Sequence, residues 1–221
     1  MARCLLCQQV LKKRILFSDL LLLKREEEGI CTECQEKFSP ISARHCPTCF
    51  KEGEETNCSD CLYWASKGLE VAHESLYRYN TQMAEYISQY KFIGDYLLRT
   101  VFAAELHQYF KNKTDYTLVP IPISEKRMAE RGFNQVTGLL SAAGLSFVDL
   151  LQKEETKKQS EKNRTERLAS KQPFAIATHM DVPEKIILID DIYTTGATIQ
   201  LARQILMKNG AKTVTSFSLA R

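Results

Sequence analysis

The sequence lacks the features that mark membrane, secreted or fibrous proteins. No hydrophobic run is long enough to span a bilayer, because the apolar stretch at residues 20–23 is followed by Lys24, Arg25 and three glutamates. No secretory signal peptide is present. Glycine and proline are scarce, at 9 and 6 of 221 residues, while 44% of the residues are hydrophobic and 26% are charged. We therefore expect a cytoplasmic globular protein of one ordinary domain with a small addition.

Two common nucleotide-binding motifs are missing as well. The chain contains no GxxxxGKS/T segment and no GxGxxG segment after a strand, which excludes the usual nucleoside-triphosphate and dinucleotide sites. A strong net charge is also lacking, since 30 basic and 27 acidic residues leave a formal charge of +3. Any nucleic-acid binding must therefore come from a local basic patch and not from the whole surface.

Cysteine is absent after residue 61, and the cysteines before it follow one spacing. A disulfide framework suits secreted chains, and a thioredoxin-like site needs a single CxxC pair on a βαβ unit. Two CxxC turns, by contrast, complete one tetrahedral Zn²⁺ site, so four pairs predict two structural zinc ions. The pairs are Cys4/Cys7, Cys31/Cys34, Cys46/Cys49 and Cys58/Cys61.

The CxxC pairs predict the role of the two sites, the extent of the domain that contains them and the grouping of their ligands. Because four thiolates leave no open position for a substrate, we expect the sites to stabilise a small fold and not to catalyse. The composition changes after residue 61, and we predict a zinc-binding domain at residues 1–67 and a second domain at residues 68–221. An interleaved grouping of the pairs is one alternative. The simplest grouping puts Cys4, Cys7, Cys31 and Cys34 in one site and Cys46, Cys49, Cys58 and Cys61 in the other.

An unbroken apolar run precedes two adjacent carboxylates late in the sequence. Residues 186–189 lack the alternation of a half-exposed strand and predict a strand buried on both faces, as in a parallel sheet. Apolar residues then recur at helical spacing over residues 199–206, before a strand-like stretch at residues 213–219. This βαβ unit places Asp190 and Asp191 at the carboxyl end of a strand, where open α/β sheets bind ligands.

The segment after the carboxylates has the composition of a phosphate site. Residues 194–198 read TTGAT and lie where the next helix begins. Helix N-termini, glycine and threonine hydroxyls all favour a bound phosphate. Asp190 and Asp191 would repel that phosphate, so sugar hydroxyls, Mg²⁺ or both explain them better. A strand end followed by an ordinary helix cap is the plain alternative, but a cap needs only one hydroxyl. We predict a sugar phosphate as the ligand.

Two further segments carry positive charge near predicted strand ends. Arg127 and Arg131 lie in a predicted loop at residues 124–135, which follows the short strand LVPIP at residues 118–122. Such arginines usually face solvent, but this position directs them to the ligand crevice and makes them candidates for pyrophosphate binding. Residues 156–167, between predicted strands at 147–151 and 174–176, form a polar loop, either a solvated loop or a functional lid. Its basic residues are candidates for nucleic-acid contacts: Lys157, Lys158, Lys162, Arg164 and Arg167.

In combination, these segments resemble a known family. The four CxxC pairs, the pattern VPIPxSxxRxxxRGFNQ at residues 119–135 and LIDDIYTTGAT at residues 188–198 are similar to those of the ComF family of competence proteins. The last of them resembles the 5-phosphoribosyl-1-pyrophosphate (PRPP) motif. The resemblance covers nearly the whole chain. It implies an α/β fold, with a type I phosphoribosyltransferase-like, doubly wound, mostly parallel sheet and an amino-terminal double zinc ribbon.

The resemblance also implies a role for each site residue. The two carboxylates would bind the ribose hydroxyls, the loop would enclose the 5′-phosphate, and basic or polar side chains would meet the pyrophosphate together with Mg²⁺. In that order, the residues are Asp190 and Asp191; Thr194, Thr195, Gly196, Ala197 and Thr198; and Arg127, Arg131 and Gln159.

Two functions fit these features. The family implies a DNA-uptake factor of natural transformation that binds single-stranded DNA and a ComFA-type helicase-like ATPase at the inner face of the membrane, with PRPP as a regulator or a remnant ligand. The alternative is an active phosphoribosyltransferase with an unidentified acceptor. No dedicated acceptor pocket is evident in the sequence, which favours the first function. Three aromatic residues are able to stack on bases: Trp64, Tyr63 and Phe133. Isolated aromatic residues, however, more often belong to a core.

Overall fold

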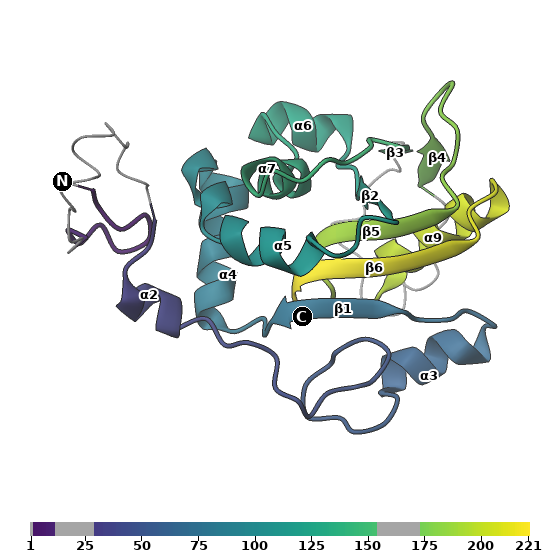
Figure 1. Cartoon of the computed structure of the whole chain (residues 1–221), viewed down its shortest axis with the longest axis horizontal. Helices are drawn as coiled ribbons and strands as arrows, with labels where there is room; N and C mark the ends of the chain where they lie inside the picture. Colours follow the sequence, from purple (N-terminus) through teal and green to yellow (C-terminus); the bar gives the residue numbers. More distant parts are fainter. Residues whose placement is uncertain (1, 12–28, 154–172) are drawn as a thin grey trace.

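The computed structural model describes residues 2–11, 29–153 and 173–221. At its centre is a four-stranded sheet in which all neighbouring strands are parallel. Helices cover both faces of the sheet (Figure 1), which confirms the predicted doubly wound α/β fold. The strand order is β1 (His73–Tyr77), β6 (Thr213–Ala220), β5 (Lys185–Ile192) and β2 (Thr117–Pro120).

The predicted βαβ unit consists of β5, α9 (Ala197–Lys208) and β6. Residues 186–189 of β5 are at most 4% exposed, as predicted for a strand covered on both faces. β5 pairs with β6 from Lys185 opposite Thr213 to Ile192 opposite Ala220. Gly196 precedes α9 with a φ of 80°, a left-handed conformation that glycine adopts without strain. The unit therefore places the carboxylates and the TTGAT loop at one end of the sheet.

Alternate residues of β5 face two different cores. Ile187 and Ile189 contribute to the first core, which also contains the buried helical residues Met83 and Tyr86. The helices over this face are α4 (Thr81–Ser88), the π-helix η1 (Gln89–Ile93), the 3₁₀-helix η2 (Tyr96–Thr100), α5 (Ala103–Phe110) and α7 (Gln135–Ala142).

Ile186 and Leu188 contribute to the second core, on the opposite face of the sheet. Helices α9 and α3 (Ser59–Ser66) cover this face, and Trp64 of α3 is buried there. The domain boundary between residues 67 and 68 remains a prediction from the sequence. One group of cysteines nevertheless packs in the same core as the sheet: Cys46, Cys49, Cys58 and Cys61.

The segment that leads from α2 (Thr32–Glu36) toward the second group of cysteines runs along the outer edge of β1. The Ile41 N–H donates to Leu76 O at 2.9 Å, and the Arg78 N–H donates to Ser39 O at 2.8 Å. Pro40 lies opposite Tyr77 in an isolated antiparallel bridge. This edge of the sheet is therefore paired and not open (Figure 1).

Two predicted segments differ from the structure. The sequence predicts a loop at residues 124–135, but α6 (Glu125–Arg131) occupies most of it. Ser124 caps α6 by accepting a hydrogen bond from the Arg127 N–H at 3.4 Å, and Gly132 ends it with a φ of 77°. The strand predicted at residues 147–151 lies further along, as β3 (Leu151–Lys153), which pairs antiparallel with β4 (Phe174–Ile176).

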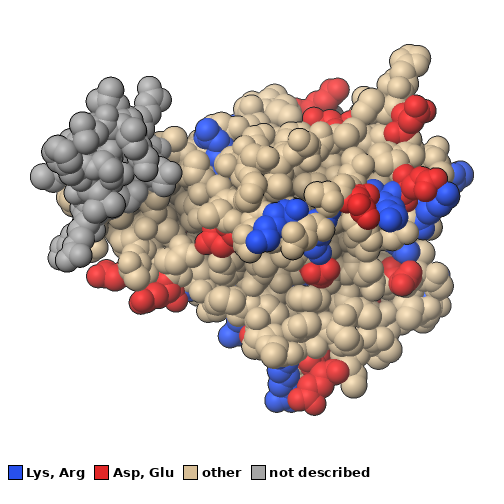
Figure 2. Space-filling view, in the orientation of Figure 1, with Lys and Arg blue, Asp and Glu red and all other residues tan. Residues whose placement is uncertain are grey.

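The surface carries charges of both signs. Figure 2 displays one face, on which basic and acidic side chains of the described residues are interspersed and no broad area has a single sign. This distribution agrees with the small net charge of +3. Among the helices within the described ranges, none combines the length and the hydropathy that a membrane span requires.

Candidate functional site

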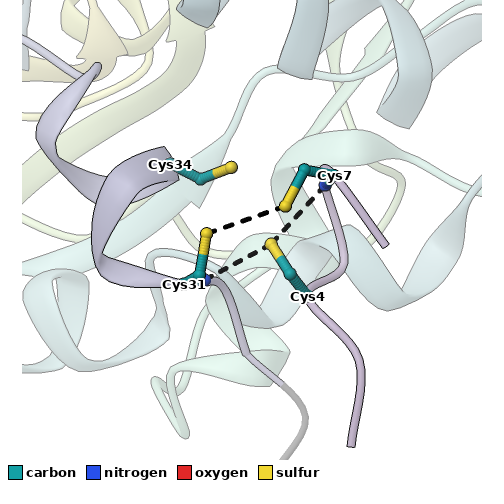
Figure 3. A group of neighbouring side chains, drawn as sticks. All are labelled: Cys4, Cys7, Cys31 and Cys34. Atoms are coloured by element: carbon teal, nitrogen blue, oxygen red, sulfur yellow. Dashed lines mark hydrogen bonds between the residues drawn. The ribbon is translucent and has the colours of Figure 1, made fainter. Parts of the chain in front are cut away.

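The first cysteine cluster joins a turn at Cys4 and Cys7 to the start of α2 at Cys31 and Cys34. Figure 3 shows the four sulfur atoms directed toward one another. Cys7 Sγ and Cys31 Sγ are 3.7 Å apart. The N–H groups of Cys7 and Cys31 donate to Cys4 Sγ at 3.5 and 3.3 Å. Burial raises the pKa of Cys4, but such backbone hydrogen bonds outweigh it and lower the pKa to about 6.

The second cluster joins a turn at Cys46 and Cys49 to α3, where Cys58 is the N-terminal cap and Cys61 lies in the first turn. All four side chains are buried. Cys49 Sγ is 3.5 Å from Cys58 Sγ, and Cys61 Sγ is 3.7 Å from Cys58 Sγ and 3.8 Å from Cys46 Sγ. Burial raises the pKa of Cys46, but hydrogen bonds from Thr48 and from backbone N–H groups lower it to about 6.

Both clusters have the geometry of a four-thiolate metal site. Within each cluster, the four Sγ atoms lie within 4.8 Å of one another. Zn–S bonds of about 2.3 Å in a tetrahedron separate the sulfur atoms by about 3.8 Å. The separations given above agree with this value, so each cluster fits a metal ion without rearrangement. The simpler of the two predicted groupings is confirmed, and the interleaved grouping is wrong.

The acidic pair at the end of β5, Asp190 and Asp191, has one side chain on each face of the sheet. Successive side chains of a strand point to opposite faces, so Asp190 and Asp191 project to different layers. Asp191 is 3% exposed, and its Oδ2 atom forms an ion pair with Lys91 of η1. Asp190 interacts electrostatically with Lys153 of β3. The two carboxylates therefore present their charge to different basic partners.

The charge of one carboxylate affects the other. Burial, and after it the negative charge of Asp191, raises the pKa of Asp190 well above its ordinary value. Lys91 opposes this rise. Because a nearby cation would relieve the remaining repulsion, the pair is suited to bind a divalent metal or the hydroxyl groups of a sugar.

Lys91 is a site residue that sequence reasoning missed. Its side chain is only 13% exposed, and it lies in the five-residue π-helix η1. Insertions of π-helix are rare and concentrate at functional sites. Neither helical spacing nor a motif distinguishes Lys91 from the exposed lysines of the chain, so only the fold reveals its ion pair.

Three basic side chains gather beside the acidic pair. Burial, and then the positive charge of Arg127, lowers the pKa of both Arg131 and Lys153. Asp191 partly offsets this effect at Arg131, and Asp190 offsets it at Lys153. Of the two predicted arginines, Arg131 therefore interacts electrostatically with Asp191, and Arg127 interacts with the other two cations, Arg131 and Lys153. Because the three cations repel one another, a bound anion would be stabilised between them.

The predicted phosphate loop lies between β5 and the twelve-residue helix α9. The first N–H groups of α9 have no partner within the helix, and the positive end of its dipole is directed at the loop. Thr194 and Thr198 are exposed, whereas Gly196 is buried. The five predicted residues of the motif therefore surround the N-terminus of one helix: Thr194, Thr195, Gly196, Ala197 and Thr198.

Two residues from distant parts of the chain hold this loop, and the sequence did not reveal either contact. Trp64 Nε1 donates to Thr195 O at 2.7 Å, and Arg221 Nη1 donates to Thr194 O at 3.2 Å. Trp64 is 6% exposed, which confirms that it is a core residue and makes stacking on a base by this ring wrong. Phe133 is also partly buried, against Tyr90 and Tyr96.

Several predicted residues lie outside the described part of the chain. Gln159 is one of them, and the basic candidates for nucleic-acid contacts are the others: Lys157, Lys158, Lys162, Arg164 and Arg167.

A cavity of about 700 Å³ has Lys153 on its wall. It is lined by the connection after β2, by α6 and α7, and by β3, so that Lys153 belongs both to the cavity and to the surroundings of Asp190. This cavity could not be expected from the sequence, because three separate segments line it. Polar residues on its wall include Glu125, Asn134 and Asp149.

Known proteins resemble the chain over nearly its whole length. Competence protein ComFC of Streptococcus pneumoniae (strain ATCC BAA-255 / R6) is 47% identical over 219 residues, which cover 99% of this chain and 100% of the relative. Competence protein ComFC of Bacillus subtilis (strain 168) is 35% identical over 227 residues, covering 99% and 94%. DNA utilization protein YhgH of Escherichia coli (strain K12) is 25% identical, covering 87% and 90%.

Comparison with solved structures finds a hypoxanthine phosphoribosyltransferase from Staphylococcus aureus, which is 15% identical over 56% of this chain and 63% of that one, with a TM-score of 0.32. No family model matches the sequence. Both comparisons with the ComFC proteins cover 99% of this chain. The chain therefore belongs to the ComFC family of competence proteins.

Proposed function

We propose that the protein acts in DNA uptake during natural transformation, where it binds single-stranded DNA and a ComFA-type helicase-like ATPase and holds PRPP or a related sugar phosphate. Membership in the ComFC family supports the competence role. One observation carries the proposed ligand: the acidic pair ends β5 just before the N-terminus of α9, and its two carboxylates interact electrostatically with the cations Arg131 and Lys153. PRPP carries its ribose hydroxyl groups between a 5′-phosphate and a pyrophosphate. Its hydroxyl groups would meet the carboxylates, and its phosphate groups would meet the helix N-terminus and the cations.

Each part of PRPP has a proposed partner. Asp190 is the carboxylate more available to the ribose hydroxyls or to Mg²⁺, because Lys91 already pairs with Asp191. The N–H and hydroxyl groups of residues 194–198 would enclose the 5′-phosphate. Arg127 and Arg131, with Gln159 and Mg²⁺, would meet the pyrophosphate. In the two cysteine clusters we propose Zn²⁺, because four thiolates at tetrahedral spacing select this ion.

Asp190→Asn should weaken PRPP binding in the presence of Mg²⁺ by about tenfold or more, since a hydrogen bond to a charged group contributes about 1.5–3 kcal/mol. Titration calorimetry on the metal-loaded protein measures this change. Asp115→Asn is the matched control, because the Asp115 side chain is 76% exposed and lies at the other end of the sheet, before β2. Equal affinities of Asp190→Asn and wild type would rule out the proposed site.

The proposed surface for single-stranded DNA lies on η1 and η2. Phe92 and Ile93 are 74% and 76% exposed, and Tyr96 and Leu97 are 42% and 45% exposed. We call these four residues the exposed apolar patch. Nucleic-acid surfaces without sequence preference combine such aromatic rings with nearby arginines. Here the Arg131 guanidinium lies 5.2 Å from the centre of the Phe92 ring, and that of Arg99 lies 4.0 Å from the centre of the Tyr96 ring.

The patch also adjoins the proposed sugar-phosphate crevice. Arg131 faces Phe92 on one side and interacts electrostatically with Asp191 on the other. Lys91, the partner of Asp191, immediately precedes Phe92 in η1. DNA on the patch would therefore lie next to the opening of the crevice, and we expect it to compete or couple with PRPP.

Replacing Phe92 and Tyr96 by alanine should weaken binding of an oligothymidylate by about thirtyfold or more, because stacking contributes about 1–3 kcal/mol per base and two rings are removed. The dependence of the affinity on salt should not change, since no phosphate contact is removed. Fluorescence anisotropy at several salt concentrations measures both quantities. Met207→Ala, which removes an exposed side chain of α9, should bind like wild type. Wild-type affinity of the double variant would place the DNA elsewhere.

An active phosphoribosyltransferase is the second candidate, and the cavity of about 700 Å³ beside Lys153 favours it. Its volume lies in the range of small-molecule sites, and an acceptor there would lie next to the proposed position of PRPP. Release of pyrophosphate from PRPP in the presence of candidate acceptors distinguishes this function from simple binding.

The contacts with the DNA backbone, the ATPase and the membrane are proposals from the family and the sequence. The basic residues at 157–167 remain the proposed phosphate contacts, and the proposed location is the cytoplasm, at the inner face of the membrane. Salt-dependent DNA binding by variants of those residues is the corresponding test.

A further inference from the structure

A series of contacts joins the second cysteine cluster to the phosphate loop. Trp64 lies in α3, three residues after Cys61, and its indole N–H donates to Thr195 O at 2.7 Å. Cys58 is the N-terminal cap of the same helix. This eight-residue helix and its cap therefore carry two of the four thiolates and the donor that holds the loop.

Arg221 makes a second connection. Its Nη1 atom donates to Thr194 O at 3.2 Å, while its Nη2 atom lies 3.9 Å from Cys58 Sγ and 3.9 Å from Asp60 Oδ2. The Arg221 side chain is 5% exposed. A buried guanidinium thus bridges the loop and a metal-binding sulfur atom.

These two hydrogen bonds orient the amide groups of the loop. In a trans peptide unit the carbonyl oxygen and the amide hydrogen point in opposite directions. Because the carbonyls of Thr194 and Thr195 point to Arg221 and Trp64, the N–H groups of Thr195 and Gly196 point away from the cluster. They precede the first N–H groups of α9, whose helix begins at Ala197. Trp64 and Arg221 therefore set the direction of two donors at the proposed phosphate position.

The packing around Tyr193 leaves the loop little freedom to change. Its ring stacks on His73 at 3.9 Å between centroids, and the Arg221 guanidinium lies 4.5 Å from its centre. A Cβ atom on Gly196 would lie 2.2 Å from the Tyr193 hydroxyl and 3.3 Å from Trp64 Nε1. The loop at Gly196 therefore packs directly against Tyr193 and Trp64, with no room for a side chain.

We propose that Trp64 and Arg221 are positioning residues through which the second cysteine cluster holds the phosphate loop ready for its anion. This inference rests on the proposed sugar-phosphate site and adds the dependence of that site on the metal cluster. The first cluster has a different environment, because its helix α2 contacts α5, where Gln35 Nε2 donates to Glu105 Oε1 at 3.1 Å. The two clusters therefore differ in what they support.

The experiment uses the full metal-loaded chain and the variant Trp64→Phe, which keeps an aromatic ring and removes the donor to Thr195. Leu62→Ala is the matched control, since Leu62 lies in the same helix with 57% exposure. Metal content and thermal unfolding establish that each variant is folded. Hydrogen exchange of residues 193–198 then reports on the loop without any ligand, and calorimetry with PRPP and Mg²⁺ reports on the site.

In Trp64→Phe we expect the loop amides to exchange about five- to tenfold faster, with β5 and β6 unchanged, and PRPP to bind about tenfold more weakly. Leu62→Ala should match wild type in both measurements. Wild-type exchange of the loop in folded Trp64→Phe would overturn the inference. If Trp64→Phe does not fold, Arg221→Gln replaces it with the same expectations. If wild-type protein binds no PRPP, the proposed function fails, while the exchange measurement still decides the inference.

The chain provides an internal reporter for the same test. Trp64 is its single tryptophan. Titration of wild-type protein with PRPP should change the Trp64 emission, because the indole is bonded to the loop that binds the phosphate. Binding that is detected by calorimetry but leaves the emission unchanged would contradict the proposed coupling.

Discussion

Lys91→Met should lower the free energy of unfolding by about 3–5 kcal/mol at about pH 8, because removing one partner leaves a buried charge uncompensated. The Lys91 and Asp191 side chains are 13% and 5% exposed, so water cannot replace the lost ammonium group effectively. Asp190 makes the loss larger, since the variant retains two neighbouring carboxylates and removes a cation that both of them feel.

The stability loss of this variant should depend on pH. Burial and the charge of Asp191 hold the pKa of Asp190 above its value in the unfolded chain, and removal of Lys91 raises this pKa further. A group with a raised pKa in the folded state contributes stability at acidic pH, which is lost as the pH rises through that pKa. The deficit relative to wild type should therefore be larger at about pH 8 than at about pH 6.

Denaturant unfolding of both proteins at the two pH values measures this effect. Lys126→Met is the matched control, because Lys126 and Glu130 form an ion pair with side chains that are 75% and 59% exposed. An exposed pair of this kind contributes less than about 1 kcal/mol. The double variant Lys91→Met with Asp191→Asn should recover much of the loss. Equal stability of Lys91→Met and wild type at both pH values would contradict a buried ion pair.

Cys49→Ala should destabilise the whole sheet. Cys49 is fully buried and belongs to the same core as β5 and α9, so loss of the proposed metal ion would disrupt packing well beyond the cluster. Metal binding contributes on the order of 10 kcal/mol to the folding of small zinc modules, and losing one ligand of four should cost several kcal/mol of this. Cys7 is exposed and lies in the other cluster, so Cys7→Ala is the natural comparison.

Metal analysis and scanning calorimetry test this difference between the clusters. Each variant should lose the ion of its own cluster. The main unfolding transition should shift to a lower temperature in Cys49→Ala and stay close to that of wild type in Cys7→Ala. Equal shifts in the two variants would mean that both clusters support the sheet to the same degree.

Much of the fold could be predicted from the sequence, because its signals are local. The CxxC spacing predicted both clusters, the unbroken apolar run predicted β5, and the position of Gly196 predicted the start of α9. Each of these patterns depends on neighbours within one or two turns of the chain.

The contacts that complete the candidate site could not be predicted, since they join residues far apart in the sequence. Lys91 meets Asp191 across 100 positions, and Trp64 meets Thr195 across 131. The helix α6 was missed because charged residues dominate residues 125–131 and no buried side chain marks a helical face. The cavity beside Lys153 was missed because three separate segments line it.

The segment at residues 39–41 has a consequence for the behaviour of the chain in concentrated solution. An outer strand with free N–H and C=O groups is a template on which a second molecule can pair. By bonding to β1, these residues occupy that template from within the same molecule. The link between the two cysteine clusters thus also protects the protein against edge-to-edge aggregation, and a shortened chain that begins beyond it would lose this protection.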